Sequence, residues 1–94
     1  MAVPPPPTLD FYERAGCAIC AEARDMLQQV LEDRAKRGES VPRVRFVDIG
    51  GRADLEGKYA AMLPVLALAG RELYLNTSYQ AIARFLDAGL PRLA

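Results

Sequence analysis

The order of strand-like and helix-like segments constrains the fold of this chain most strongly. Residues 8–12 have the length and apolar spacing of a strand, and residues 17–37 carry apolar side chains at steps of three and four, as an amphipathic helix does. Gly38 follows as a helix stop, and residues 43–49 predict a second strand. The side chains expected to face the core are Ile19, Ala23, Met26, Leu27, Val30 and Leu31 of the helix and Val44, Phe46 and Val47 of the strand.

The second half of the chain predicts a short helix, a β-hairpin and a last helix. The short helix covers residues 52–61 and has to end before Pro64, because a residue that precedes proline is disfavoured in the helical region. Strand-length runs at 65–69 and 72–75 flank a tight turn at Gly70-Arg71. In the last helix, Thr77 and Gln80 have the spacing of a capping box. The inward side chains of the two helices are expected to be Leu55, Tyr59, Met62, Tyr79, Ile82, Ala83 and Leu86.

The resulting order, β-α-β-α-β-β-α, predicts an α/β fold. A right-handed crossover through the first helix makes the first two strands parallel, and the hairpin adds antiparallel strands. We therefore expect a four-stranded mixed sheet with helices on both faces. The 94 residues suffice for one domain, which we place at residues 8–94, after a flexible leader at 1–7 whose run Pro4–Pro7 favours polyproline II.

Composition and charge exclude several classes of function. The 12 basic and 12 acidic side chains cancel, so we expect neither a nucleic acid nor a membrane as partner, and no apolar run reaches the length of a membrane span. The absence of histidine removes the commonest metal ligand and the usual partner of a catalytic cysteine. The N-terminus lacks the basic and apolar regions of a secretory signal, so we expect a cytoplasmic protein, and we expect a monomer.

The two cysteines carry the clearest chemical signal. Cys17 and Cys20 form a Cys-x-x-Cys motif between the first strand and the first helix. At the start of a helix, free backbone N–H groups and the helix dipole stabilise a thiolate, which is the attacking species in disulfide exchange. Cys20 lies one turn deeper on nearly the same face, where it can close a disulfide with Cys17 and release a bound substrate.

Three other interpretations of the cysteine pair remain open. A structural disulfide over two intervening residues constrains little of the unfolded chain. A zinc site needs four ligands, which only a dimer could supply, so we expect no metal. Two inert cysteines packed like small apolar residues are the third possibility. The position of the motif within a β-α-β pattern favours redox chemistry over all three.

The chain resembles the glutaredoxins of the thioredoxin-fold superfamily from about Thr8 to Leu86. The segment Phe11-Tyr12-Glu13-Arg14-Ala15-Gly16-Cys17-Ala18-Ile19-Cys20 is similar to the glutaredoxin active-site segment. The second half is similar to a glutaredoxin-like domain family of bacteria and eukaryotes, in the residues Val47-Asp48-Ile49, Asp54-Leu55, Lys58-Tyr59 and Leu63-Pro64-Val65-Leu66.

This resemblance implies roles for particular residues. Cys17 is the implied nucleophile and Cys20 the resolving thiol, while Arg14 stands where glutaredoxins often carry a lysine that favours the thiolate. Pro64 is the implied cis-proline beside the cysteines, and Leu63 offers its backbone N–H and C=O to an extended substrate. Thr77 and Ser78, at the start of the last helix, stand where the family holds the glutathione carboxylate.

Three departures from the glutaredoxin pattern leave glutathione specificity open. Ala18-Ile19 replaces Pro-Tyr between the cysteines, Met62-Leu63 replaces Thr-Val before the proline, and Asn76-Thr77-Ser78 replaces a Gly-Gly-acidic signature. We therefore expect an enzyme that reduces protein disulfides or glutathione mixed disulfides. Its electrons come from glutathione, as a co-substrate, or from a reductase, with no bound cofactor. A non-enzymatic redox sensor or peptide-binding module is the alternative.

Overall fold

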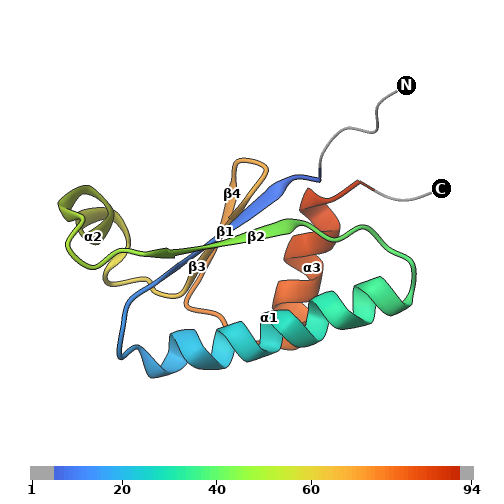
Figure 1. The fold of residues 1–94 in the computed structure, drawn as a ribbon, viewed down its shortest axis with the longest axis horizontal. Coiled ribbons are helices and arrows are strands. Elements are labelled where there is room, and N and C mark those ends of the chain that lie inside the picture. Colours follow the sequence, from blue (N-terminus) through green and yellow to red (C-terminus); the bar gives the residue numbers. More distant parts are fainter. Residues whose placement is uncertain (1–5, 92–94) are drawn as a thin grey trace.

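The computed structural model describes residues 6–91, and its elements follow the predicted order (Figure 1). Of the leader expected at residues 1–7, residues 1–5 lie outside the described part, and residues 6–7 belong to no helix or strand. The elements are β1 (Thr8–Glu13), α1 (Ala18–Lys36), β2 (Arg43–Asp48), α2 (Ala53–Tyr59), β3 (Val65–Leu68), β4 (Arg71–Tyr74) and α3 (Tyr79–Gly89).

The four strands form one mixed sheet, as the sequence predicts, and their order is β2-β1-β3-β4. β1 runs parallel to β2, with Phe11 opposite Phe46, and antiparallel to β3, with Phe11 opposite Leu66. β4 pairs antiparallel with β3 through a turn at Ala69 and Gly70, whose φ angles are +53° and +76°. Two positive φ angles are what a two-residue hairpin loop with the twist of its strands needs. The turn therefore lies one residue earlier than Gly70-Arg71.

Helices lie on both faces of the sheet, as predicted, but only α1 and α3 cover a face, and α2 packs at one end of the other. On one face, the main core packs Leu9 and Phe11 of β1 against α1 and α3, which lie together beneath the sheet in Figure 1. The neighbouring residue Tyr12 points to the opposite face, as the alternation of a strand requires. There its ring stacks on Tyr59 of α2, with 4.4 Å between the ring centroids.

Two residues that the sequence places in the core are exposed. Ile19 retains 39% of its surface, because the buried stripe of α1 runs through Cys20, Ala23, Leu27 and Val30, and Ile19 lies beside it. Phe46 retains 45%, because β2 is an edge strand. The Phe46 ring contacts the Phe11 ring, with 5.4 Å between the two centroids. The guanidinium of Arg24 lies over the Phe46 ring, 3.8 Å from the centroid of that ring.

The start of α3 also differs from the sequence interpretation. The N-cap is Ser78, whose Oγ accepts a hydrogen bond from the N–H of Ala81, so the capping box built on Thr77 is wrong. The helix begins one residue later because Asn76 turns the preceding loop, with its Oδ1 accepting from the N–H of Ser78. The expected inward residues Ile82 and Leu86 are buried, and Phe85 joins them.

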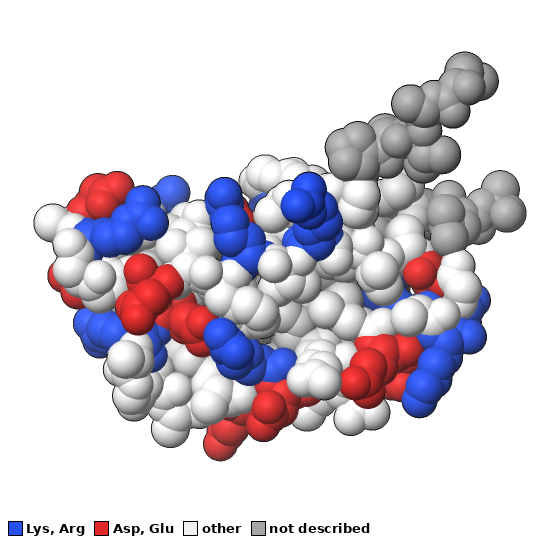
Figure 2. Space-filling view, viewed as in Figure 1, with Lys and Arg blue, Asp and Glu red and all other residues white. Residues whose placement is uncertain are grey.

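Charged side chains of both signs are interspersed over the face shown in Figure 2, with no large region of one sign. None of the helices within residues 6–91 is both long enough and apolar enough to cross a membrane.

Candidate functional site

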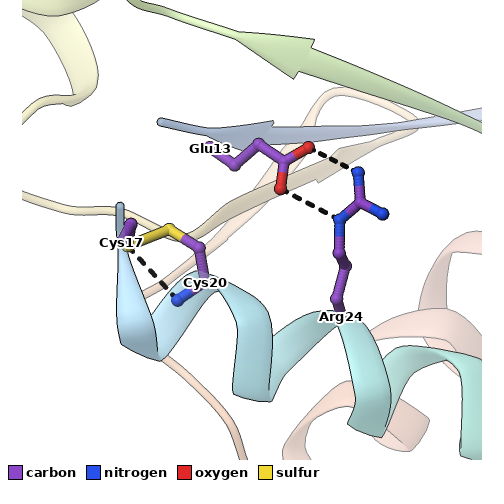
Figure 3. Close-up of a disulfide and its surroundings, with 4 residues drawn as sticks. All are labelled: Glu13, Cys17, Cys20 and Arg24. Carbon is purple, nitrogen blue, oxygen red and sulfur yellow. Dashed lines mark hydrogen bonds and ion pairs between the residues drawn. A yellow bond between two sulfur atoms is a disulfide. The ribbon is translucent and has the colours of Figure 1, made fainter. Parts of the chain in front are cut away.

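Cys17 lies at the junction of the β1–α1 loop with the helix. It is the N-cap of α1, and its Sγ accepts a hydrogen bond from the N–H of Cys20 at 3.2 Å (Figure 3). The sulfur thus takes the place that a serine or aspartate oxygen has in most helix caps. Gly16, with φ +80°, makes the turn into this position, and the N–H of Cys17 bonds to the carbonyl of Arg14 at 3.2 Å.

The two cysteines form a disulfide and differ in burial. Their Cα atoms are 5.2 Å apart, and both sulfur atoms are joined in Figure 3. Cys17 is partly exposed, whereas Cys20 keeps only 2% of its surface and packs with Ile49, Tyr59 and Leu63. An exposed sulfur beside helix N–H groups and a buried sulfur one turn deeper are suited to attack and resolution, respectively.

A second feature of this region, the Glu13–Arg24 pair, was not predicted from the sequence. Arg24 donates two hydrogen bonds to the Glu13 carboxylate, at 3.0 and 2.8 Å (Figure 3). The bond to Glu13 raises the pKa of Arg24, and both side chains line the same hollow as Cys17 and Cys20. The sequence could have indicated that Arg24 lies near the cysteines, because it follows Cys20 by four residues and so lies on the same side of α1.

The Leu63–Pro64 peptide bond is cis, in agreement with the expectation from the resemblance. Leu63 packs in the same cluster as Cys20, and Cys17 and Met62 contact that cluster. The N–H of Leu75 bonds to the carbonyls of Met62, at 3.2 Å, and Pro64, at 2.9 Å. Within residues 6–91, the backbone N–H and C=O of Leu63 itself have no hydrogen-bond partner. Buried backbone groups are normally paired, so this residue presents an open donor and acceptor.

The other residues predicted for the site differ in position. Arg14 is exposed and lines the hollow around Cys17. Thr77 is partly buried in the loop after β4. The Ser78 Oγ accepts a hydrogen bond from Ala81 as the cap of α3, and the Ser78 N–H donates to Asn76, so this N–H is not free for a ligand.

Tyr59 is a buried aromatic, as the sequence analysis expects, and Tyr74 is exposed. The hydroxyls of both residues donate to the carboxylate of Glu72. Burial, with the bond to Glu72, raises the pKa of Tyr59. These two hydrogen bonds lower the pKa of Glu72. The cluster thereby anchors α2 to β4 on the face away from α1.

No group of three or more potential metal ligands comes together within the described residues. The two cysteines are paired with one another. The chemistry that this arrangement offers is therefore that of a dithiol and its disulfide.

Comparison with known proteins places the chain in a family. Residues 8–87 match the family model described as Glutaredoxin-like domain (DUF836). The chain belongs to this glutaredoxin-like family. A solved structure, of the Northeast Structural Genomics target protein XcR50 from X. campestris, is 32% identical and superposes with a TM-score of 0.70. The alignment covers 85% of this chain and 96% of that one. No curated protein matches the chain.

The family match and the solved structure agree with the fold described above. The protein is a glutaredoxin-like domain with a thioredoxin-type α/β fold and a Cys-x-x-Cys pair. The family resemblance identified from the sequence is confirmed, and the redox-related fold is confirmed with it.

Proposed function

We propose that this protein is a thiol–disulfide oxidoreductase that reduces disulfides of proteins or mixed disulfides of glutathione. The observation that carries the proposal is the asymmetry of the cysteine pair. The partly exposed Cys17 caps α1, and its sulfur accepts a hydrogen bond from the N–H of Cys20. Cys20, whose sulfur is bonded to that of Cys17, is buried. Helix N–H groups stabilise a thiolate at Cys17 over a thiol, and the thiolate is the form that attacks a disulfide.

The reaction proceeds by two thiol–disulfide exchanges. The Cys17 thiolate attacks one sulfur of the substrate disulfide, a Cys17–substrate disulfide forms, and the other substrate sulfur leaves as a thiolate. Cys20 loses its proton and attacks Cys17, which releases the second substrate sulfur and forms the Cys17–Cys20 disulfide. Two electrons pass to the substrate. Glutathione or a reductase returns them in a reducing compartment such as the cytoplasm, with no bound cofactor.

The residues around the pair have assigned roles in this proposal. The open N–H and C=O of Leu63 form a one-residue strand bridge with the substrate backbone, and Pro64 places them beside the sulfurs. The Arg14 guanidinium, in the hollow around Cys17, favours the thiolate. Thr77 and Ser78 border the substrate next to Leu75, and the Ser78 N–H itself donates to Asn76 and is not available to a carboxylate.

Substitution of each cysteine tests the proposal. We expect Cys17→Ser to abolish reduction of both an insulin-type protein disulfide and a glutathione mixed disulfide, because the attacking thiolate is lost. We expect Cys20→Ser to accumulate a Cys17–substrate mixed disulfide, because the resolving step is lost. Turnover is measured with glutathione and with a thioredoxin-type reducing system, and the adduct is detected by intact-protein mass spectrometry.

Turnover, together with a measured pKa of the Cys17 thiol, distinguishes the enzyme from a redox sensor or peptide-binding module. Full turnover by Cys17→Ser protein contradicts the assigned nucleophile. Absence of turnover in the unmodified protein, together with a Cys17 thiol pKa near 8.5, favours the non-enzymatic alternative.

A further inference from the structure

Leu75 has an unusual combination of properties beside the segment that carries Leu63 and Pro64. It is 56% exposed, yet it is a large apolar residue, and its φ of +52° lies in the left-handed region that side chains of this kind disfavour. Its N–H bonds to the carbonyls of Met62 and Pro64, which flank Leu63 on both sides. The strained backbone therefore fixes an exposed leucine next to the open N–H and C=O of Leu63. Strain of this kind tends to persist at functional sites.

The segments that meet here carry no charge. Residues 15–21, 60–65 and 75–78 contain no Asp, Glu, Lys or Arg, in a chain of which 26% is charged. The first two segments share the cluster that includes both cysteines, and the third is hydrogen-bonded to the second. Ile19, between the cysteines, adds an apolar side chain that is 39% exposed.

Glutathione fits this surface poorly. It carries two carboxylates and an ammonium group close to its sulfur, and each needs a partner of opposite charge or a polar solvent shell. Arg14 and Arg24 line the hollow around Cys17, and Arg24 is already paired with Glu13. An extended peptide with apolar residues next to its cysteine has the complementary chemistry, because Leu63 can pair its backbone while Leu75 contacts its side chains.

We propose that Leu75 is a specificity-determining residue, which selects protein disulfides flanked by apolar residues over glutathione mixed disulfides. The proposal rests on the oxidoreductase function proposed above and names its substrate class. In the selected reaction, the Cys17 thiolate attacks the sulfur of the peptide cysteine, and the other sulfur leaves as a thiolate. The peptide is thus held on Cys17 against Leu63 and Leu75 until Cys20 displaces it.

Two mixed disulfides with the same leaving group test this selection. One joins 2-nitro-5-thiobenzoate to glutathione, and the other joins it to a capped, neutral peptide with leucine on each side of its cysteine. Release of the coloured thiolate from each mixed disulfide, when it is mixed with the pre-reduced protein, gives the second-order rate of the first step. We expect the peptide disulfide to react at least about tenfold faster than the glutathione one.

The Leu75→Asn variant keeps a residue that tolerates the left-handed conformation and removes the apolar side chain. We expect it to slow the peptide reaction about threefold to tenfold and to change the glutathione reaction less than about twofold. Leu75→Met should retain the preference. Val41→Asn, which removes a 39% exposed apolar side chain next to the start of β2, is the matched control and should leave both rates unchanged.

The outcomes separate this proposal from the one that it rests on. If the unmodified protein reacts with neither disulfide, the oxidoreductase function fails. If it reacts with both and shows no preference for the peptide, or if Leu75→Asn slows both reactions equally, the oxidoreductase function stands and the role of Leu75 is overturned. Should Leu75→Asn fail to fold, Leu75→Gly, which relieves the backbone strain, gives the same comparison.

Discussion

The two ends of α1 are held in contrasting ways. At the C-terminal end, the side chain of Arg34 is only 5% exposed; it pairs with Asp87 of α3 and donates to the carbonyl of Ser40 at 2.9 Å. The hydroxyl of Ser40 in turn donates to the carbonyl of Pro91 at 2.8 Å. At the N-terminal end, the cap is the sulfur of Cys17, and the ion pair Glu13–Arg24 is partly exposed, with 18% and 46% of the two side-chain surfaces accessible.

The difference shows which end is structural and which is open to chemistry. A buried guanidinium that bonds two other segments holds α1, the following loop and α3 in one arrangement, and its loss leaves polar groups without partners. The sulfur cap and the open backbone of Leu63 leave the other end with few contacts that a substrate has to displace. We therefore expect substitutions at the C-terminal end to change stability, and those at the N-terminal end to change reactivity.

The largest effect on stability is expected for Arg34→Met. The substitution keeps most of the side-chain volume but removes the donors for Ser40 and Asp87, so we expect the free energy of unfolding to fall by about 1–3 kcal/mol. Urea unfolding of the disulfide form measures it. Arg37→Met is the matched control, because it removes an exposed ion pair with Glu39 on the same turn and should have a much smaller effect. Equal losses in the two variants would remove the contrast between the ends.

A smaller effect, on reactivity, is expected for Arg24→Met. The variant leaves the Glu13 carboxylate unpaired in the hollow of Cys17, and a nearby negative charge disfavours the thiolate. We expect the rate of thiol alkylation at neutral pH to fall about twofold to threefold, while stability changes little. In the control, Arg45→Met, a similar pair with Asp10 on β1 is lost away from the cysteines. The same decrease in rate in the control would show that Glu13 has no specific influence.

A smaller effect on stability than that of Arg34→Met is expected for the Glu72 anchor of α2. Hydrogen bonds from Tyr59 and Tyr74 lower the pKa of Glu72, so its contribution to stability is complete above the ordinary carboxyl pKa and decreases as the pH falls toward the lowered value. Glu72→Gln should therefore be less stable than the unmodified protein by about 1 kcal/mol at pH 7, and this difference should shrink below about pH 4. Thermal unfolding across this pH range measures it. A difference that does not depend on pH would mean that the charge of Glu72 contributes nothing.

Local signals in the sequence were enough for the order of elements, the mixed sheet and the position of the cysteine pair. Periods of two and of three to four residues identify strands and helices without knowledge of the partner segment, because each element has to bury one face. The Cys-x-x-Cys spacing and its place before a helix indicate dithiol chemistry for the same local reason. The predictions for Ile19 and Phe46 were wrong because burial of these side chains depends on the tertiary arrangement. Ile19 lies beside the buried stripe of α1, and Phe46 lies on the edge strand β2.

The tertiary structure decided which distant residues share the site. Leu63 and Leu75 are brought together by hydrogen bonds between two loops, and Glu13 meets Arg24 only because α1 packs back along β1. In the sequence, Arg34 is one of several basic residues near the end of a helix. In the structure it is buried and connects α1 to α3, because α3 packs against α1. The two cysteines are three residues apart, so the sequence alone predicts their chemistry. The surface proposed to select a substrate consists of segments that come into contact only when the chain folds.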